Sequence, residues 1–180
     1  LEPSRAEGYT KRANVHLLQN NPGLAAVDIS KAIQIEPKNP ATYAVRAQLY
    51  ESEKKYKEAV ADYTSSIELN PKSAATYLQR GDLLTKQGKF DDAIRDYDRA
   101  AELDPRNARP YESRCKAEVK RGGSSAKAVQ DCSIAIAIDP TVEDAYIYRA
   151  RIFDLESRAL QAVYKEPPQS MADRIRGRVN

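Results

Sequence analysis

The chain has 180 residues, of which 41% are apolar and 31% are charged, and its formal net charge is +3. Nucleic-acid binding usually needs a concentrated basic face, so this small charge does not favour a nucleic-acid partner. No apolar run has the length of a membrane-spanning helix, and the first five residues do not resemble a signal peptide. We therefore expect no membrane insertion, and a thin, elongated fold would explain the high share of charged residues.

A period of 34 residues runs through the sequence and divides it into units. Prolines recur in steps of 34, 34, 34 and 35 residues, at Pro3, Pro37, Pro71, Pro105 and Pro140. Tyrosines keep the same spacing, at Tyr9, Tyr43, Tyr77, Tyr111 and Tyr146. An arginine follows each tyrosine by three residues, at Arg12, Arg46, Arg80, Arg114 and Arg149. The next residue is small in every unit, at Ala13, Ala47, Gly81, Cys115 and Ala150. So many positions in phase indicate a repeat architecture.

Each unit predicts two helices joined by a short turn. In the second unit, apolar and small residues share one face of residues 42–50 and one face of residues 57–69 at helical spacing. The second helix of each unit carries an alanine and, three residues later, an aspartate, at Ala25 and Asp28, Ala59 and Asp62, Ala93 and Asp96, and Ala128 and Asp131. The closing proline cannot continue its helix and so marks the turn into the next unit. In chain order, we expect the end of a preceding repeat at 1–5 and complete units at 6–39, 40–73, 74–107 and 108–142.

The last part of the chain departs from the pattern. Residues 143–165 begin a fifth unit, but Pro167 and Pro168 exclude the second helix that would complete it. We expect its first helix to continue as a capping helix that covers the helix at 126–138. The residues spaced to share the covering face are Leu155, Ala159 and Ala162. Residues 166–180 form a basic tail, for which a short helix and disorder are equal alternatives.

A unit of 34 residues with an aromatic residue, a small residue, an alanine and a closing proline resembles the tetratricopeptide repeat. The resemblance covers residues 6–140, and tyrosine stands where that family more often has tryptophan. It implies an all-α, right-handed superhelical solenoid of antiparallel helix pairs. It also implies a non-catalytic scaffold that holds a protein or peptide partner in its concave groove.

The same resemblance places the groove along exposed residues of the first helices. The residues expected to face it are Thr10, Asn14, Ala44, Gln48, Leu78, Asp82, Glu112, Lys116, Ile147 and Arg151. Asn14 and Gln48 can bond an extended peptide backbone through donor and acceptor groups. For any one of the ten, a plain solvated position is the alternative. One branch of the family binds the C-terminal carboxylate of heat-shock chaperones, but only Asn14 matches its pattern of residues, so we do not expect that activity here.

The recurrent arginine and aspartate lie close to the seam between paired helices. We expect each arginine to hold an aspartate carboxylate through two bonds, in its own unit or in the preceding one. The fifth unit lacks the second helix that carries the aspartate, so Arg149 is expected to use Asp131. A structural arginine–aspartate ladder is the favoured interpretation, because every unit carries the pair, and a charged ligand site is the alternative.

Other chemically active residues fit positions of the repeat. His16 occupies the position of Tyr50 and Leu84, so packing is favoured over a role as base or metal ligand. Cys115 and Cys132 are interpreted as core residues, with a reactive thiol as the alternative, and two cysteines make no disulfide framework. No second histidine and no group of nucleophile, base and orienting residue stands out. The sequence therefore predicts no catalytic residue, no metal site and no cofactor.

These features favour a protein–protein interaction scaffold or adaptor that binds a peptide or helix of a partner. An assembly or oligomerisation module of a larger multi-repeat complex is the first alternative, and it would allow self-association. A targeting arm of an enzyme or co-chaperone is the second. The low cysteine count is consistent with a reducing compartment, from which we expect a cytoplasmic protein.

Overall fold

A computed structural model describes residues 5–122 and 126–165, with side chains described as far as residue 158. The helices in these ranges are α1 (Arg5–Leu18), α2 (Pro22–Ile35), α3 (Pro40–Ser52), α4 (Tyr56–Leu69), α5 (Ala74–Lys86), α6 (Phe90–Leu103), α7 (Ala108–Lys120), α8 (Ala126–Ile138) and α9 (Glu143–Lys165). The described residues contain no strand, which confirms the all-α prediction. The expected end of a preceding repeat falls almost wholly outside the described residues, and so does the basic tail.

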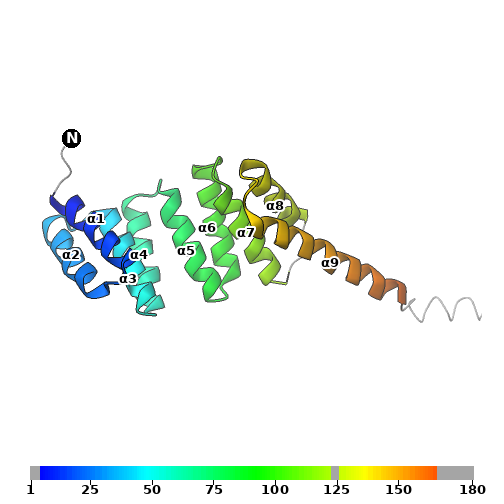
Figure 1. The fold of residues 1–180 in the computed structure, drawn as a ribbon, viewed down its shortest axis with the longest axis horizontal. Coiled ribbons are helices and arrows are strands. Elements are labelled where there is room, and N and C mark those ends of the chain that lie inside the picture. The colour runs from blue at the N-terminus through cyan, green and yellow to red at the C-terminus, as the bar shows by residue number, and fades with distance from the viewer. Residues whose placement is uncertain (1–4, 123–125, 166–180) are drawn as a thin grey trace, which may run out of the picture.

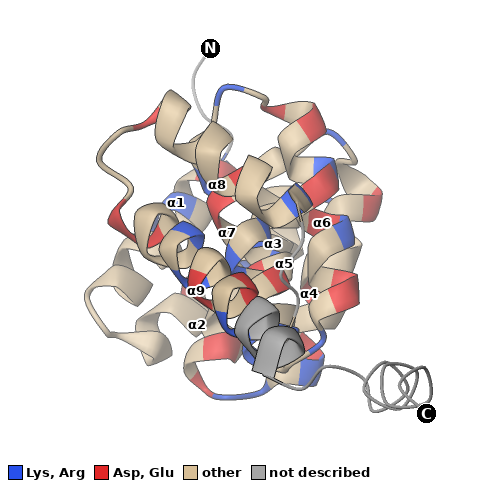
Figure 2. Cartoon of the chain, turned by 90° about the vertical axis from the view of Figure 1, so that its right-hand side faces the viewer, with Lys and Arg blue, Asp and Glu red and all other residues tan. Residues whose placement is uncertain are grey.

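The helices stack in pairs along the array. Figure 1 shows α1 with α2, α3 with α4, α5 with α6, and α7 with α8, one pair after another, with α9 following the last pair. Viewed along the array in Figure 2, α3, α5 and α7 lie toward the centre, whereas α4, α6 and α8 lie toward the outside. The first helices of the units therefore line the inner side of the array.

The residue two places after a closing proline starts the next first helix. The side-chain oxygen of Asn39 accepts hydrogen bonds from the backbone N–H groups of Ala41 and Thr42. Ser73 and Asn107 cap α5 and α7 in the same way. Such a cap satisfies N–H groups that the start of a helix otherwise leaves without a partner. The helix starts are therefore set locally, at a fixed distance beyond the proline.

The turn after each complete first helix contains a residue with positive φ at one fixed place in the repeat. These residues are Asn20 (58°), Lys54 (60°), Gly88 (75°) and Gly122 (93°). Glycine adopts this conformation without steric cost, whereas the Cβ atoms of asparagine and lysine disfavour it. The period of the sequence therefore extends to the backbone conformation of the turn.

Paired helices approach closely where a small residue of the first helix faces a large residue of the second. A Cβ atom built on Gly81 would lie 2.7 Å from Cε1 of Tyr97. In the second unit, Ala47 and Tyr63 occupy the same two positions and belong to one cluster of buried residues. The small residue of each unit is thus explained by the side chain that packs on it.

We expect Gly81→Ala to lower the free energy of unfolding by about 1–3 kcal/mol, because the new methyl group would overlap the buried Tyr97 ring. Urea denaturation of the two proteins measures the difference. Gly8→Ala is a matched control, since Gly8 is also helical but has no atom within 4 Å of the added Cβ. The control should be neutral or stabilising. Equal stability of the two variants would contradict the close contact with Tyr97.

In the fourth unit a disulfide replaces the contact between small and large residues. Cys115 stands at the small position and Cys132 at the tyrosine position, and their Cα atoms are 5.6 Å apart. Both residues are fully buried. They are core residues, as expected, but the interpretation that they form no disulfide is wrong, because the repeat itself brings these two positions together. Disulfides persist mainly in oxidising compartments, so the cysteines no longer support the cytoplasmic expectation.

The fifth unit begins with one long helix, α9, which confirms the predicted continuation of its first helix. Ala145 and Ile152 are fully buried in a cluster shared with α8. Leu155 is 40% exposed, and the later turns of α9 extend beyond the array in Figure 1. The predicted cover of the helix at 126–138 is thus made by Ala145 and Ile152, while Leu155 remains partly exposed. The side chains of Ala159 and Ala162 lie outside the described part of the chain.

Candidate functional site

The arginine–aspartate ladder forms inside each complete unit. Each guanidinium donates from Nε and Nη2 to the two carboxylate oxygens, over distances of 2.5 to 2.8 Å. The pairs are Arg12–Asp28, Arg46–Asp62, Arg80–Asp96 and Arg114–Asp131. The predicted contacts of Arg46, Arg80 and Arg114 are confirmed, and the aspartate comes from the same unit.

Two arginines of the ladder also reach the preceding unit. Nη1 of Arg80 donates to Oγ1 of Thr64 at 3.0 Å. Nη1 of Arg114 donates to the Asp98 carboxylate at 2.5 Å. Each of these arginines thus joins three helices: its own, the second helix of its unit and the second helix of the unit before.

Arg149 does not follow the prediction. Its Nη1 donates to Oγ of Ser133 at 3.4 Å, and its guanidinium carbon lies 5.6 Å from the ring centroid of Tyr146. The predicted contact with Asp131 is wrong, because that carboxylate is already held by Arg114 through two bonds.

The ladder has the properties of a structural element. Its aspartates are buried, and the exposed fraction of the arginine side chain falls from 58% at Arg12 to 10% at Arg114. Hydrogen bonds from Arg12 hold the pKa of Asp28 below its ordinary value, although burial acts in the opposite direction. Each carboxylate already has a bidentate cationic partner, which favours the structural interpretation over a ligand site.

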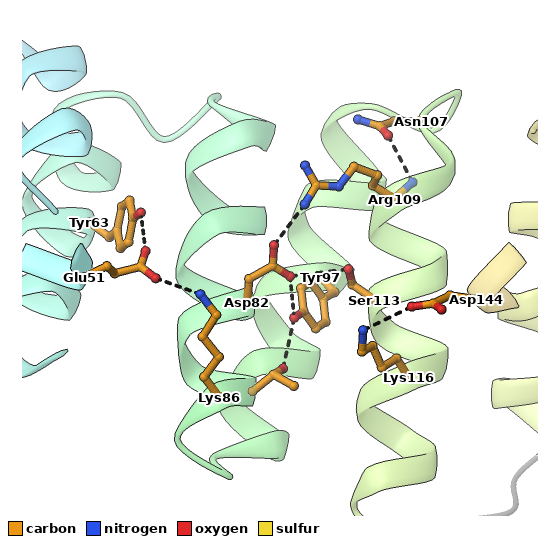
Figure 3. Close-up of polar contacts among 11 residues, drawn as sticks. Glu51, Tyr63, Asp82, Lys86, Tyr97, Asn107, Arg109, Ser113, Lys116 and Asp144 are labelled. Carbon is orange, nitrogen blue, oxygen red and sulfur yellow. Dashed lines mark hydrogen bonds and ion pairs between the residues drawn. The ribbon is translucent and has the colours of Figure 1, made fainter. Parts of the chain in front are cut away.

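A pocket opens on the inner side of the array between α5 and α7, with a volume of about 370 Å³. Figure 3 shows polar side chains of both helices in this region. The lining residues are Asp82, Thr85 and Lys86 of α5, Tyr97 of α6, and Arg109, Glu112, Ser113, Lys116 and Lys120 of α7. We call this hollow the α5–α7 pocket.

Asp82 is the centre of a hydrogen-bond network in the pocket. It accepts bonds from the Tyr97 hydroxyl at 2.9 Å, from Nη2 of Arg109 at 3.1 Å and from Oγ of Ser113 at 3.4 Å (Figure 3). The Tyr97 oxygen lies 3.0 Å from Oγ1 of Thr85, from which it can accept. Burial and the Asp82 charge raise the pKa of Tyr97, so this hydroxyl stays a donor. The negative charge of Asp82 is therefore well compensated.

The lysines of the pocket are less firmly held. Lys86 pairs with Glu51 of α3 at 3.1 Å, and its side chain is 65% exposed. Lys116 pairs with Asp144 of α9 at 3.2 Å (Figure 3). Lys120 is exposed and has no ion pair within the described residues. The exposed Lys86–Glu51 pair contributes little to stability, so Lys86 and Lys120 remain open to a ligand.

Glu112 lies on the same wall of α7 and is half-buried. Burial is the main cause that raises its pKa, and the nearby Asp144 acts in the same direction. The positive charges of Lys116 and Arg109 act in the opposite direction, but they do not cancel the rise in the pKa of Glu112. The pocket therefore carries four cationic side chains and two acidic ones, of which Asp82 is compensated internally.

The ten residues that were expected to face the groove have different surroundings in the structure. Asp82, Glu112 and Lys116 line the α5–α7 pocket, while the half-buried Asn14, Ala44 and Gln48 and the exposed Ile147 and Arg151 lie outside it. Thr10 and Leu78 are 4% and 5% exposed, so the expectation that they offer groove surface is not met. Thr10 bonds Thr42 of α3 at 2.8 Å, and Leu78 belongs to the core around α6.

Several lining residues were missed by reasoning from the sequence. They are Thr85, Lys86, Tyr97, Arg109, Ser113 and Lys120. Tyr97 lies on a second helix, and its ring packs on Gly81 while its hydroxyl reaches Asp82 of α5. The sequence signal that could have found it is this pairing of a glycine with a tyrosine on the other helix.

His16 packs beside the first pair of the ladder. Its Nε2 lies 3.7 Å from Oδ2 of Asp28, and its Nδ1 is buried without a hydrogen-bond partner. Within the described residues, no three His, Cys, Asp or Glu side chains are grouped so that they could hold a metal ion. None of the described helices combines the length and the apolar character needed to cross a lipid bilayer.

Comparison with known proteins agrees with this architecture. Two family models, both described as tetratricopeptide repeat, match residues 40–73 and 74–107. Residues 40–107 therefore consist of two tetratricopeptide repeats. The search of curated protein sequences found no match.

Solved structures with the same fold are distant in sequence. The structure of Pseudomonas aeruginosa pilF has a TM-score of 0.78 and 18% identity, over 86% of this chain and 70% of that chain. A structure of MamA has a TM-score of 0.65 and 20% identity, over 77% and 81% of the two chains. The first TPR of Spaghetti, bound to an HSP90 peptide, has a TM-score of 0.63 and 19% identity, over 66% and 94%. These likenesses show the fold.

Proposed function

We propose that this protein-interaction scaffold binds an extended, acidic segment of a partner protein on the inner side of the array. The observation that carries the proposal is the α5–α7 pocket, whose lining includes Lys86, Arg109, Lys116 and Lys120. Arg109 and two neutral donors already hold Asp82, so the three lysines outnumber Glu112, the remaining acidic side chain of the lining. Carboxylates of a partner would find charge-assisted partners there.

The residues outside the pocket extend the proposed contact surface. Asn14 and Gln48 are half-buried on α1 and α3, where their amides can bond the backbone of a bound segment. Ile147 and Arg151 are exposed on α9 and would contact its other end. We also propose that the chain divides into complete units at 6–39, 40–73, 74–107 and 108–142, with a partial unit at 143–165.

Charge reversal in the pocket should weaken partner binding. A photoreactive residue at Ser113 would first crosslink the partner segment, which is then made as a synthetic peptide. Calorimetry should show roughly tenfold weaker binding for the double variant Lys86→Glu and Lys120→Glu, with a reduced salt dependence. Lys57→Glu, an exposed position on α4, is the control and should bind normally. Full affinity of the double variant would overturn the proposal.

The assembly alternative has one observation in its favour. Val15, Leu18, Leu24 and Val27 are exposed large apolar residues on the first helix pair. Such a group can mark a protein-binding surface. Sedimentation separates the two functions, because self-association that is lost in Leu18→Glu, with no partner bound in the pocket, would favour assembly. No described feature supports the alternative of a targeting arm.

A further inference from the structure

The outer face of α9 lacks the cover that the other first helices have. Ala150 is exposed, whereas its counterparts Ala13, Ala47, Gly81 and Cys115 are buried. In the complete units, the second helix lies over this position, as the contact of Gly81 with Tyr97 shows. At α9, the described residues include no second helix of the same unit.

Two aromatic residues lie on the same face of α9 as Ala150. Tyr146 precedes it by four residues and Phe153 follows it by three, which places all three on one side of the helix. Their side chains are 42% and 52% exposed. The counterparts in the third unit, Tyr77 and Leu84, pack against the cluster that includes residues of α6. The exposed apolar surface of α9 is thus the surface that a second helix covers elsewhere.

Arg149 lacks the carboxylate that every other arginine of the ladder holds. Its guanidinium is stacked on Tyr146 and donates only a long bond to Ser133, and no acidic side chain accepts from it within the described residues. In the four complete units the carboxylate comes from the second helix. The face therefore combines an apolar surface with an unmatched positive charge at a fixed place.

We propose that this α9 face, formed by Tyr146, Arg149, Ala150 and Phe153, binds an amphipathic helix of a partner protein that carries an aspartate opposite Arg149. The second helices α2, α4 and α6 define the pattern that fits: an alanine, an aspartate three residues later, a large residue directly after it and a small residue three further on. In α4 these residues are Ala59, Asp62, Tyr63 and Ser66. The bound helix completes the fifth unit in trans and is separate from the α5–α7 pocket.

A second copy of the chain is a poorer occupant than a partner helix. The ladder aspartates of the complete units are buried, and each is held by the arginine of its own unit. A second copy would have to break one of these pairs to reach Arg149. A helix with an uncommitted aspartate meets no such cost.

The test uses the full chain and a synthetic peptide with the sequence of α4, residues 56–69, whose tyrosine packs on an alanine in the second unit. Amide signals of the isotope-labelled chain are followed by NMR during titration with the peptide. We expect shifts centred on residues 146–153. An otherwise identical peptide with Asp62→Asn should bind roughly tenfold more weakly, because it offers no carboxylate to the guanidinium of Arg149. Ala150→Tyr in the chain should block binding of both peptides, and because Ala150 is exposed, this variant should keep the native fold.

A charge swap gives the sharpest result. Arg149→Asp in the chain should abolish binding of the native peptide and restore binding of the peptide with Asp62→Arg. The proposal is overturned if the native peptide causes no shifts at millimolar concentration, if the shifts map elsewhere, or if both charge states of the peptide bind equally. It is also overturned if deletion of residues 166–180 shifts the Ala150 and Phe153 signals, since the chain itself would then cover the face. Self-association that Ala150→Tyr abolishes would assign the face to a second copy instead.

Discussion

Asp96→Ala should lower the free energy of unfolding by about 3 kcal/mol, because it leaves the guanidinium of Arg80 without its charged partner. The Arg80 side chain is 20% exposed, so water cannot fully replace the lost carboxylate. Its remaining bond goes to the neutral hydroxyl of Thr64. Urea denaturation followed by circular dichroism measures the change.

Two comparisons separate the effect of an unpaired buried charge from a general loss of packing. Asp28→Ala removes the same contact where the Arg12 side chain is mostly exposed, so the loss should be smaller. Replacing both members of the buried pair, as Asp96→Leu with Arg80→Met, should recover a large part of the stability. Equal losses for Asp96→Ala and Asp28→Ala would show that burial of the arginine does not set the cost.

Removal of the disulfide should cost a similar amount. Cys115→Ala with Cys132→Ala should lower the free energy of unfolding by about 3 kcal/mol, because the bond closes a segment with a sequence separation of 17. Addition of a reductant to the native chain should lower its melting temperature. A melting temperature that reductant leaves unchanged would mean that the bond does not form.

The neighbouring units offer a replacement for the bond. Cys115→Ala with Cys132→Tyr reproduces the contact that Ala47 and Tyr63 make in the second unit. This variant should be more stable than the double alanine variant, because the tyrosine fills the space that the smaller residue leaves. No difference between the two variants would contradict the equivalence of these positions.

The helix pairs could be predicted because each local signal repeats. The prolines, the small residues and the ladder positions recur with one period, and the caps at Asn39, Ser73 and Asn107 follow the prolines at a fixed distance. The disulfide was missed although the period placed Cys115 and Cys132 at known positions. The small size of Cys115 and the apolar character of Cys132 are enough for core packing, and core packing alone does not indicate a bond between them.

The inner surface could be predicted only in part. Asp82 and Lys116 were found because they share one position of the repeat. Whether a first-helix side chain faces open space also depends on how closely successive units approach, and the period does not encode that distance. The prediction that Thr10 faces the groove was wrong for this reason, since α1 and α3 come close enough for Thr10 to bond Thr42. The prediction for Arg149 was wrong because the Asp131 carboxylate already accepts two bonds from Arg114.

The ladder arginines reach the preceding unit to different extents, which should make the array stiffer toward its C-terminal half. Arg46 makes no bond to the preceding unit within the described residues, Arg80 bonds the neutral Thr64, and Arg114 bonds the charged Asp98. In a linear array, stability is a sum of single units and nearest-neighbour couplings. Thermal fluctuations should therefore open the first helix pair before the others, while the helices around the α5–α7 pocket stay closed. A bound segment would then contact a rigid surface at the α5–α7 pocket and a more flexible surface at the first helix pair.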